Sequence, residues 1–568
     1  MAGDLRLFLK FTSIDVMRLP ILPTTAIGLC LAILFLTGVK SGPQAILPNS
    51  PDDDLFELRK NFEIFGALYE EVVVNYVDQV HPQPFMKTGV DAMLADLDPY
   101  TRFYDQADNM DIAQMQSGPQ ATVGLNIGME GGMLTVLAPE SINSGYRRGV
   151  QIGDRLVSVD GVSVDEITVR DVVVLLRGEE GTIVELVFER EGEALPVSFQ
   201  LQREVPERGN ISYAGYLGPD STDRIGYVRL DTFGPRAARE VKRAFRSMIR
   251  GGGLNGAVLD LRNNPGGLVS EAVELVGLFV PKGTLVVSIQ GRDESRHVGH
   301  STADDPFMSD IPLVILVNEF SASSSEIVSG ALQDLDRAVI VGSTTFGKGL
   351  VQVGKALPYN SSMRITIGHY YTPRGRDLQS RRISSRSAQI SRPSIQKYRT
   401  ISGRPVRSGV GIEPDVMFSE KEKSEFHKAL IRDGAFFKFA GYWVRENHSS
   451  PDTRKLYDSF SEWLNQEGFL YLTEAEKSLN RASASLSEVW DPGIADAIQL
   501  AQEGIREQKN LDLQRGQEEL SEAVLAEVQS RLLDRDVYIQ VRLQADQVAN
   551  EALQIVIDKS RYHSILTL

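Results

Sequence analysis

The chain has 568 residues, a length at which several domains are expected rather than one hydrophobic core. Its 76 acidic residues against 60 basic ones give a formal charge of −16, which argues against nucleic acid as the main partner. Cys30 is its only cysteine, so an intramolecular disulfide, a cysteine nucleophile and a cysteine-ligated zinc site are excluded.

Residues 21–39 are mostly apolar, and as a helix they would be about 28 Å long, enough to cross a bilayer. Basic residues in segment 1–20 predict that it lies in the cytoplasm and that the linker 40–53 and everything after it lie on the periplasmic side. The sequence thus predicts a single-pass inner-membrane protein. A cleaved signal peptide is the alternative, although the run is long and no A-x-A site closes it.

Segment 54–117 carries apolar residues at helical spacing and predicts a helical N-terminal domain that breaks at Pro99. The apolar stripe begins with Leu55, Leu58, Phe62 and Phe65.

Segment 118–205 consists of short β-rich runs separated by glycines, with one helix over 168–176. A small β-barrel of this kind resembles a PDZ domain, in which a peptide adds as a strand beside a glycine-rich strand entry. The predicted peptide-binding residues are Gly124, Leu125, Asn126 and Ile127. Residues 144–149 depart from the usual small-residue pattern, and a barrel that serves only as a spacer is the alternative.

Segment 206–416 alternates buried strands with helices and predicts an α/β core. The strand over 256–261 is followed by Arg262-Asn-Asn-Pro-Gly-Gly267, and loops at strand ends are where open α/β sheets bind ligands. The N–H groups of Gly266 and Gly267 could form half of an oxyanion hole, or the glycines could simply make a tight turn.

The apolar strand 312–318 leads through Ser321-Ala-Ser-Ser-Ser-Glu326 into an amphipathic helix. Such an elbow can hold a serine nucleophile, but the spacing of Ser323 and Glu326 also fits a capping box. No histidine lies nearby, whereas Lys348 stands between two glycines and could act as the base if desolvation lowers its pKa. Gln352 could orient its amine, whether the segment is strand or helix.

The insertion 374–408 is basic and serine-rich, which predicts a solvated loop, with anionic lipid headgroups as a conceivable ligand. The pattern of segment 417–568 predicts charged amphipathic helices that form a packing or dimerising module.

Five motifs occur in the order found in the carboxyl-terminal processing peptidases, which this sequence resembles from about residue 55 to 416. They are Asp260-Leu-Arg-Asn-Asn-Pro-Gly-Gly267, Ser321-Ala-Ser-Ser-Ser-Glu326, Phe346-Gly-Lys-Gly-Leu-Val-Gln352, Tyr371-Thr-Pro-Arg-Gly-Arg376 and Gly411-Ile-Glu-Pro-Asp415. The resemblance implies a serine endopeptidase with an α/β, crotonase-like core.

The same resemblance assigns roles to individual residues. Ser323 would be the nucleophile, Lys348 the base and Gln352 its support. The backbone N–H of Ser324, where the family usually has alanine, would complete the oxyanion hole with Gly266 or Gly267. Arg177 would link peptide binding in the PDZ domain to the active site.

The expected fold class is multidomain α+β: an N-terminal transmembrane helix, a helical N-terminal region, a PDZ-like barrel, the protease core and a helical C-terminal region. The expected function is a membrane-anchored endopeptidase that recognises C-terminal tails, with a catalytically silent PDZ scaffold or a partner-activated protease as alternatives. Expected partners are proteins with unstructured tails, the membrane, and a second copy or an activating partner. No metal, cofactor or nucleic acid is expected.

Overall fold

The computed structural model describes residues 51–106, 108–109, 121–130, 132–139, 144–165, 167–190, 192–205, 209–218, 223–292, 295, 297–380, 395–418, 423–447, 453–467, 473–485 and 492–567. The chain divides into two compact units, residues 1–82 and 83–568, and each is described by itself.

The first unit contains helix α1 (Pro51–Asn75), and α2 (Pro82–Ala95) follows at the start of the second. The predicted stripe lies on α1 and is exposed: Leu55 retains 61% of its accessible surface and Phe62 retains 77%.

The prediction of a transmembrane helix is wrong. Residues 21–39 lie outside the described residues, and among the helices that the structure describes none is both long and apolar enough to cross a bilayer. Helix α1 has the length, but acidic and basic side chains run along it, and charges are costly inside hydrocarbon. The fold class loses its transmembrane element, and the single-pass inner-membrane location derived from it is contradicted.

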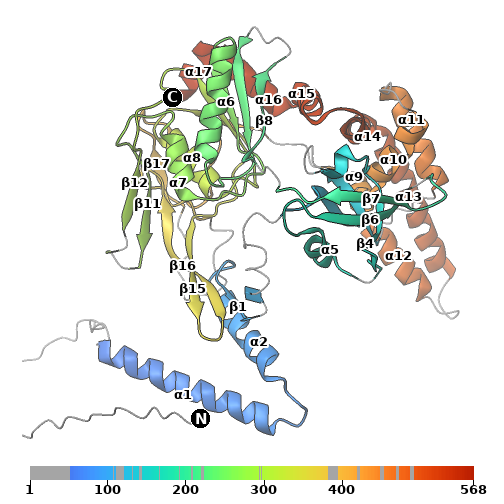
Figure 1. Ribbon diagram of the computed structural model, residues 1–568, viewed down its shortest axis with the longest axis horizontal. Helices are drawn as coiled ribbons and strands as arrows, with labels where there is room; N and C mark the ends of the chain where they lie inside the picture. Colours follow the sequence, from blue (N-terminus) through green and yellow to red (C-terminus); the bar gives the residue numbers. More distant parts are fainter. Residues whose placement is uncertain are drawn as a thin grey trace, which may run out of the picture. The chain divides into compact units, whose positions relative to one another are not determined.

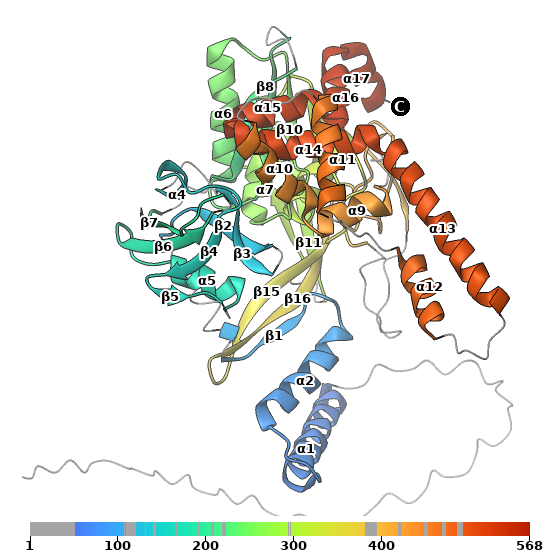
Figure 2. The same cartoon turned by 90° about the vertical axis from the view of Figure 1, so that its right-hand side faces the viewer.

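The segment predicted as a PDZ domain forms a sheet in the order β2-β3-β4-β6-β7, with β5 paired to β4 (Figure 2). Its elements are β2 (Leu125–Glu130), β3 (Met133–Pro139), α4 (Ser144–Arg147), β4 (Arg155–Val159), β5 (Val162–Ser163), α5 (Val169–Leu176), β6 (Ile183–Glu189) and β7 (Val197–Gln202). Alternate residues of the strands, such as Leu186 and Phe188, are fully buried in a core of their own, as period-two patterning requires. Helix α5 begins with a capping box in which Thr168 and Asp171 bond each other's backbone.

The α/β core is a six-stranded sheet in the order β19-β14-β13-β10-β9-β8, parallel except for the β8–β9 pair. Its strands are β8 (Ile211–Leu217), β9 (Ile225–Leu230), β10 (Gly256–Asp260), β13 (Leu313–Val317), β14 (Val339–Gly342) and β19 (Val416–Met417). The central strands β10 and β13 are buried along their whole length, which explains why their sequences are continuous apolar runs.

Helices cover both faces of this sheet (Figure 1). One face packs against α6 (Ala237–Gly251), α7 (Val269–Val276) and α8 (Ser324–Asp334). The other packs against α16 (Gln547–Ile557) and α17 (Lys559–Leu566), where Leu553, Val556 and Tyr562 are buried. The last helices of the chain therefore complete the α/β core.

A second sheet has the order β1-β16-β11-β12, and β15 also pairs with β16. Its strands are β1 (Arg102–Tyr104), β11 (Leu285–Gly291), β12 (Val298–Ser301), β15 (Leu350–Leu357) and β16 (Ser361–Tyr371). It joins the segment just before the PDZ strands to the strands that follow Lys348.

The remaining C-terminal helices are α9 (Glu425–Arg432), α10 (Ala435–Glu446), α11 (Thr453–Gln466), α12 (Glu474–Ala484), α13 (Pro492–Arg515), α14 (Gln517–Leu532) and α15 (Arg535–Ala545). Apolar residues of α9, α10, α11 and α14 form a separate core rich in aromatic rings, including Phe439 and Phe460. The helical C-terminal region of the predicted fold class is confirmed.

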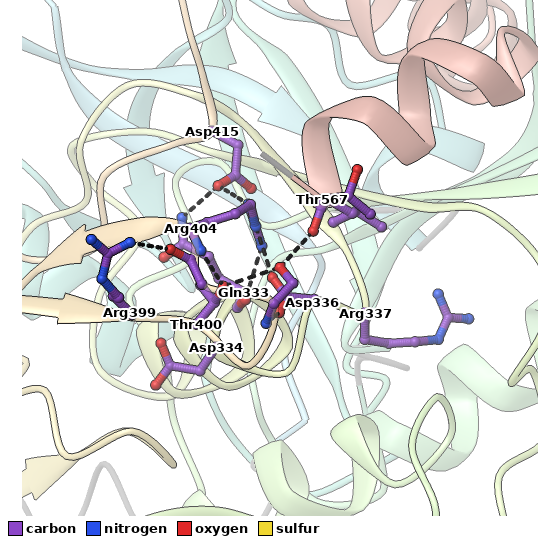
Figure 3. A network of polar contacts seen from close by, with 12 residues as sticks. Gln333, Asp334, Asp336, Arg337, Arg399, Thr400, Arg404, Asp415 and Thr567 are labelled. Carbon is purple, nitrogen blue, oxygen red and sulfur yellow. Dashed lines mark hydrogen bonds and ion pairs between the residues drawn. The ribbon is translucent and has the colours of Figure 1, made fainter.

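Buried ion pairs hold both ends of the basic insertion, and Figure 3 shows those of Arg404. Arg404 lies between Asp336 and Asp415, and the Arg376 guanidinium lies 2.7 Å from Asp334. The hairpin of β17 (Lys397–Arg399) and β18 (Pro405–Arg407) lies within this stretch. The ends of the insertion are therefore tied to the C-terminal end of α8, while 381–394 lie outside the described residues.

Candidate active site

The predicted elbow is present between β13 and α8. Ser323 is the last residue before the helix and has a φ of 54°, a left-handed conformation that costs a non-glycine residue about 1–3 kcal/mol. The turn before it is held by Ser321, whose hydroxyl donates to the Leu261 carbonyl at 2.8 Å. The Ser323 side chain is half-buried, and with Glu326 it forms a capping box at the start of α8.

The Glu326 carboxylate is fully buried and accepts four hydrogen bonds. One oxygen accepts the N–H of Ser323 at 2.9 Å and that of Lys348 at 2.8 Å. The other accepts the N–H of Gly347 at 2.7 Å and the hydroxyl of Thr345 at 2.6 Å. Burial raises the pKa of Glu326 to about 7, and these four bonds oppose that rise because they favour the ionised form.

Glu326 therefore does more than cap a helix. Its carboxylate joins the backbone of Ser323 to the loop that carries Lys348. The capping-box spacing was the signal in the sequence, but it identifies only the bond to Ser323, because the other three donors come from a distant segment.

Lys348 is half-buried, and its amine lies 4.8 Å from the centroid of the Tyr100 ring. Burial lowers the pKa of Lys348, the positive charge of Arg364 lowers it further, and Glu326 acts in the opposite direction. These are the conditions under which a lysine can serve as a base. In the described part of the chain no hydrogen bond joins the Lys348 amine to the Ser323 hydroxyl.

Gln352 lies on β15, so the stretch after Lys348 is a strand rather than a helix. Its side-chain nitrogen is buried and has no hydrogen-bond partner among the described residues. A buried amide N–H without an acceptor costs free energy of folding, so this side chain can donate a hydrogen bond to a polar group that enters the site.

The glycine loop packs directly on the elbow. A Cβ added at Gly266 would lie 2.9 Å from both the Ser323 Cβ and the Ser324 nitrogen, so only glycine fits there. The Gly266 N–H already donates to the Asn264 side chain at 2.8 Å. In contrast, the N–H groups of Gly267 and Ser324 donate to no other group within the described residues.

The Ser324 hydroxyl adds a link that the sequence did not predict. It donates to the Gly267 carbonyl at 3.0 Å and so ties the two segments that carry the free N–H groups. Of the two predicted glycines, Gly267 is the one whose N–H has no acceptor among the described residues.

The predicted peptide-binding residues lie at the start of β2, an edge strand of the PDZ sheet. Leu125 and Ile127 point into the core, Asn126 is exposed, and Gly124 has a φ of 67°. The described strands pair with only one edge of β2, and the other edge can receive a further strand.

Arg177 caps the C-terminal end of α5, and in the described part of the chain no hydrogen bond or ion pair joins its side chain to Ser323, Lys348 or Gln352. The structure thus brings together Ser323, Ser324, Gly266 and Gly267, and it ties the backbone of Lys348 to them through Glu326.

The site combines a serine at a strand-to-helix elbow, a lysine whose pKa is lowered by burial, and backbone N–H groups without an acceptor among the described residues. These features are those of a serine-type peptidase, here combined with a PDZ domain. The sequence matches the model "Peptidase family S41" over residues 224–386, a PDZ domain model over 144–190 and "Probable PDZ-protease, C-terminal helical domain" over 426–556.

Curated relatives agree with these matches. The chain is 31% identical to a carboxy-terminal-processing protease of Bartonella bacilliformis, over 63% of this chain and 80% of that protein. It is 34% identical to a carboxyl-terminal-processing protease of Synechocystis, over 51% of this chain and 68% of that protein. The solved photosystem II D1 C-terminal processing protease is 28% identical over 64% of this chain and 86% of that one, with a TM-score of 0.36. On the sequence relatives, this chain belongs to the family of carboxyl-terminal processing proteases.

Proposed function

We propose that this chain hydrolyses peptide bonds through an acyl-enzyme on Ser323, with Lys348 as general base. The observation that carries the proposal is the shared Glu326 oxygen, which accepts the backbone N–H of both residues. This bond pair fixes the serine at the helix N-terminus and the lysine loop beside it.

In the first step Ser323 Oγ attacks the scissile carbonyl carbon, and its proton passes to the Lys348 amine. The carbonyl oxygen, now negatively charged, accepts hydrogen bonds from the N–H groups of Gly267 and Ser324. The ammonium of Lys348 then protonates the leaving amine, and water releases the acyl group with Lys348 again as base. Gln352 orients the lysine through its otherwise unpartnered amide.

The PDZ domain supplies substrate selection. An unstructured C-terminal tail adds as a strand to the open edge of β2, at Gly124 to Ile127, and the chain upstream of the tail reaches Ser323. Arg177, at the end of α5, is the candidate for coupling tail binding to cleavage.

Digestion of an unstructured test protein by the full chain tests this proposal. The parent should cleave, and Ser323→Ala and Lys348→Ala should each lose at least about a thousandfold in rate while retaining the fold. Cleavage at the parent rate by a folded Ser323→Ala or Lys348→Ala variant would refute the assigned pair.

A partner-activated protease is the second candidate, favoured by one observation. Ser323 and Lys348 are not hydrogen-bonded to each other in the described structure. If the parent is folded but inactive alone, and gains Ser323-dependent cleavage when a binding protein is added, this second candidate is the correct one. A folded chain that binds tails and never cleaves would instead support the silent scaffold.

A further inference from the structure

Tyr100 lies against the amine of the proposed base. The Lys348 nitrogen is 4.8 Å from the centroid of its ring, within the roughly 6 Å at which an ammonium is attracted to an aromatic face. In the part of the chain that the structure describes, this nitrogen makes no hydrogen bond or ion pair. The ring face therefore lies against an amine that has no hydrogen-bond partner among these residues.

The loop that carries Tyr100 is held firmly. Asp98 accepts the N–H of Tyr100 and of Thr101, each at 2.8 Å, and the Thr101 hydroxyl at 2.7 Å. Thr101 in turn accepts the N–H of Thr366 at 3.3 Å, and Thr366 is the residue of β16 that pairs with Gln352. The loop is thus attached to the same strand pair that carries the proposed supporting glutamine.

The hydroxyl of Tyr100 does not explain its position. It is buried and has no hydrogen-bond partner among the described residues. Burial raises the pKa of Tyr100 to about 12, with the negative charge of Glu326 adding to the effect, so the phenol stays neutral. What Tyr100 offers to Lys348 is the negative face of a neutral ring.

Resting on the catalytic role proposed for Lys348, we propose that Tyr100 is a positioning residue. Its ring face holds the ammonium form of Lys348 away from Ser323, and the side chain joins the serine as it loses its proton. A neutral amine has no comparable attraction to the ring, so the contact and the protonation state are linked.

Other groups that act on Lys348 come from two elements. Arg364 of β16 repels the ammonium, and Glu326 of α8 attracts it through its charge. Both remain in place when Tyr100 is changed, so an effect of the ring can be measured against a constant background.

The test is the titration of Lys348 itself. It is measured by competitive labelling of the full chain with acetic anhydride at a series of pH values and by mass spectrometry of the peptide that contains Lys348. Tyr100→Leu should lower the labelling pKa by about 0.4 to 1.5 units, because losing the ring removes a stabiliser of the charged form. Tyr100→Phe keeps the face and should leave the value unchanged. Tyr104→Leu, on the neighbouring strand β1, is the matched control and should also leave it unchanged.

Incorporation of phenylalanine with increasing fluorine substitution at position 100 guards against a folding defect in the leucine variant. Each fluorine draws electron density from the ring and weakens the negative potential of its face, with little change in the ring's shape. The pKa of Lys348 should therefore fall stepwise. An unchanged or raised pKa in Tyr100→Leu and across the fluorinated series would overturn the proposal, as would an equal shift in Tyr100→Phe.

This experiment is separable from the proposed function. Labelling can be performed in the Ser323→Ala background, where no cleavage is needed. Lys348→Ala that still cleaves would refute the role of the base whatever the labelling shows. Loss of cleavage in Lys348→Ala without any pKa shift in Tyr100→Leu would refute only the role of Tyr100.

Discussion

The carboxylate of Glu326 accepts the backbone N–H of Lys348 at a distance of 2.8 Å. The same oxygen accepts the N–H of Ser323 at 2.9 Å. One buried atom thereby couples the two segments of the proposed catalytic pair. The Phe346 N–H, which donates to the Ser321 carbonyl at 3.0 Å, joins the same two segments.

Glu326→Gln should impair both stability and activity. The amide has one acceptor oxygen in place of two and turns an NH₂ group toward backbone donors, which leaves buried donors without partners at about 1–3 kcal/mol each. We expect a loss of several kcal/mol in the free energy of unfolding and at least about a hundredfold in kcat, measured by urea denaturation and peptide cleavage. Glu319→Gln is the control, since the one hydrogen bond of the Glu319 carboxylate among the described residues comes from the Ser343 hydroxyl at an exposed position. Equal effects of both substitutions would contradict the bridging role.

Stability should depend on pH through Glu326. Its pKa is about 7 in the folded chain and about 4.5 when unfolded, so the folded state binds more protons between these values. The stabilising contribution is therefore complete below about pH 4.5 and is lost as pH rises to about 7. The free energy of unfolding should fall by up to about 3 kcal/mol over this window. Glu326→Gln should remove that component, and an identical slope in the variant would contradict the assignment.

The rate of cleavage should rise with pH as Lys348 deprotonates. Because burial and Arg364 lower the pKa of Lys348, the rising limb of kcat/KM should have its midpoint below 10.5. Lys348→Arg should abolish activity, since guanidinium remains protonated. A profile that stays flat between pH 6 and pH 10, with full activity, would exclude lysine as the base.

Ser324→Ala should lower kcat with little effect on KM. The substitution removes the hydroxyl bond to the Gly267 carbonyl and loosens one oxyanion donor relative to the other. We expect a loss of about two- to tenfold, in keeping with a hydrogen bond of about 1 kcal/mol. The matched control is Ser325→Ala, which removes a bond of the same 3.0 Å length to the Asn264 carbonyl. A larger loss of kcat in the control would argue against a role for the hydrogen bond between Ser324 and Gly267.

Blocking a substrate's C-terminus should weaken its recognition. If tails add to the β2 edge with their carboxylate on backbone N–H groups, an amidated tail should show a KM raised about tenfold or more, with kcat nearly unchanged. Competition by a free peptide with the same C-terminus provides the control. Identical kinetics for free and amidated tails would leave the PDZ domain without a role in carboxylate capture.

Much of the α/β core could be predicted because its central strands are buried on both faces. The run at 313–317 is apolar throughout and became β13, and the serine cluster after it became the start of α8. Glycine positions were also informative, because a Cβ at Gly266 would collide with the elbow at Ser323 and only glycine fits there.

The relationships that escaped prediction join residues far apart in the chain. Nothing near Glu326 in sequence indicates that it accepts the N–H of Lys348, and nothing near Tyr100 indicates that it faces that lysine. Amphipathic helices such as α16 show that they have an apolar face but not which sheet it covers. The anchor was inferred from the length and hydropathy of residues 21–39 and from the basic residues before them, and no helix in the described part of the chain supports it.

Labelling with a fluorophosphonate tests the central claim most directly, because the reagent is attacked by an activated serine and requires no substrate. The account predicts one adduct per full-length chain at Ser323, found by mass spectrometry. Its rate should increase with pH and be lost in Lys348→Ala. Labelling of another residue, or of Ser323 at an unchanged rate in folded Lys348→Ala, would contradict the proposed serine–lysine pair.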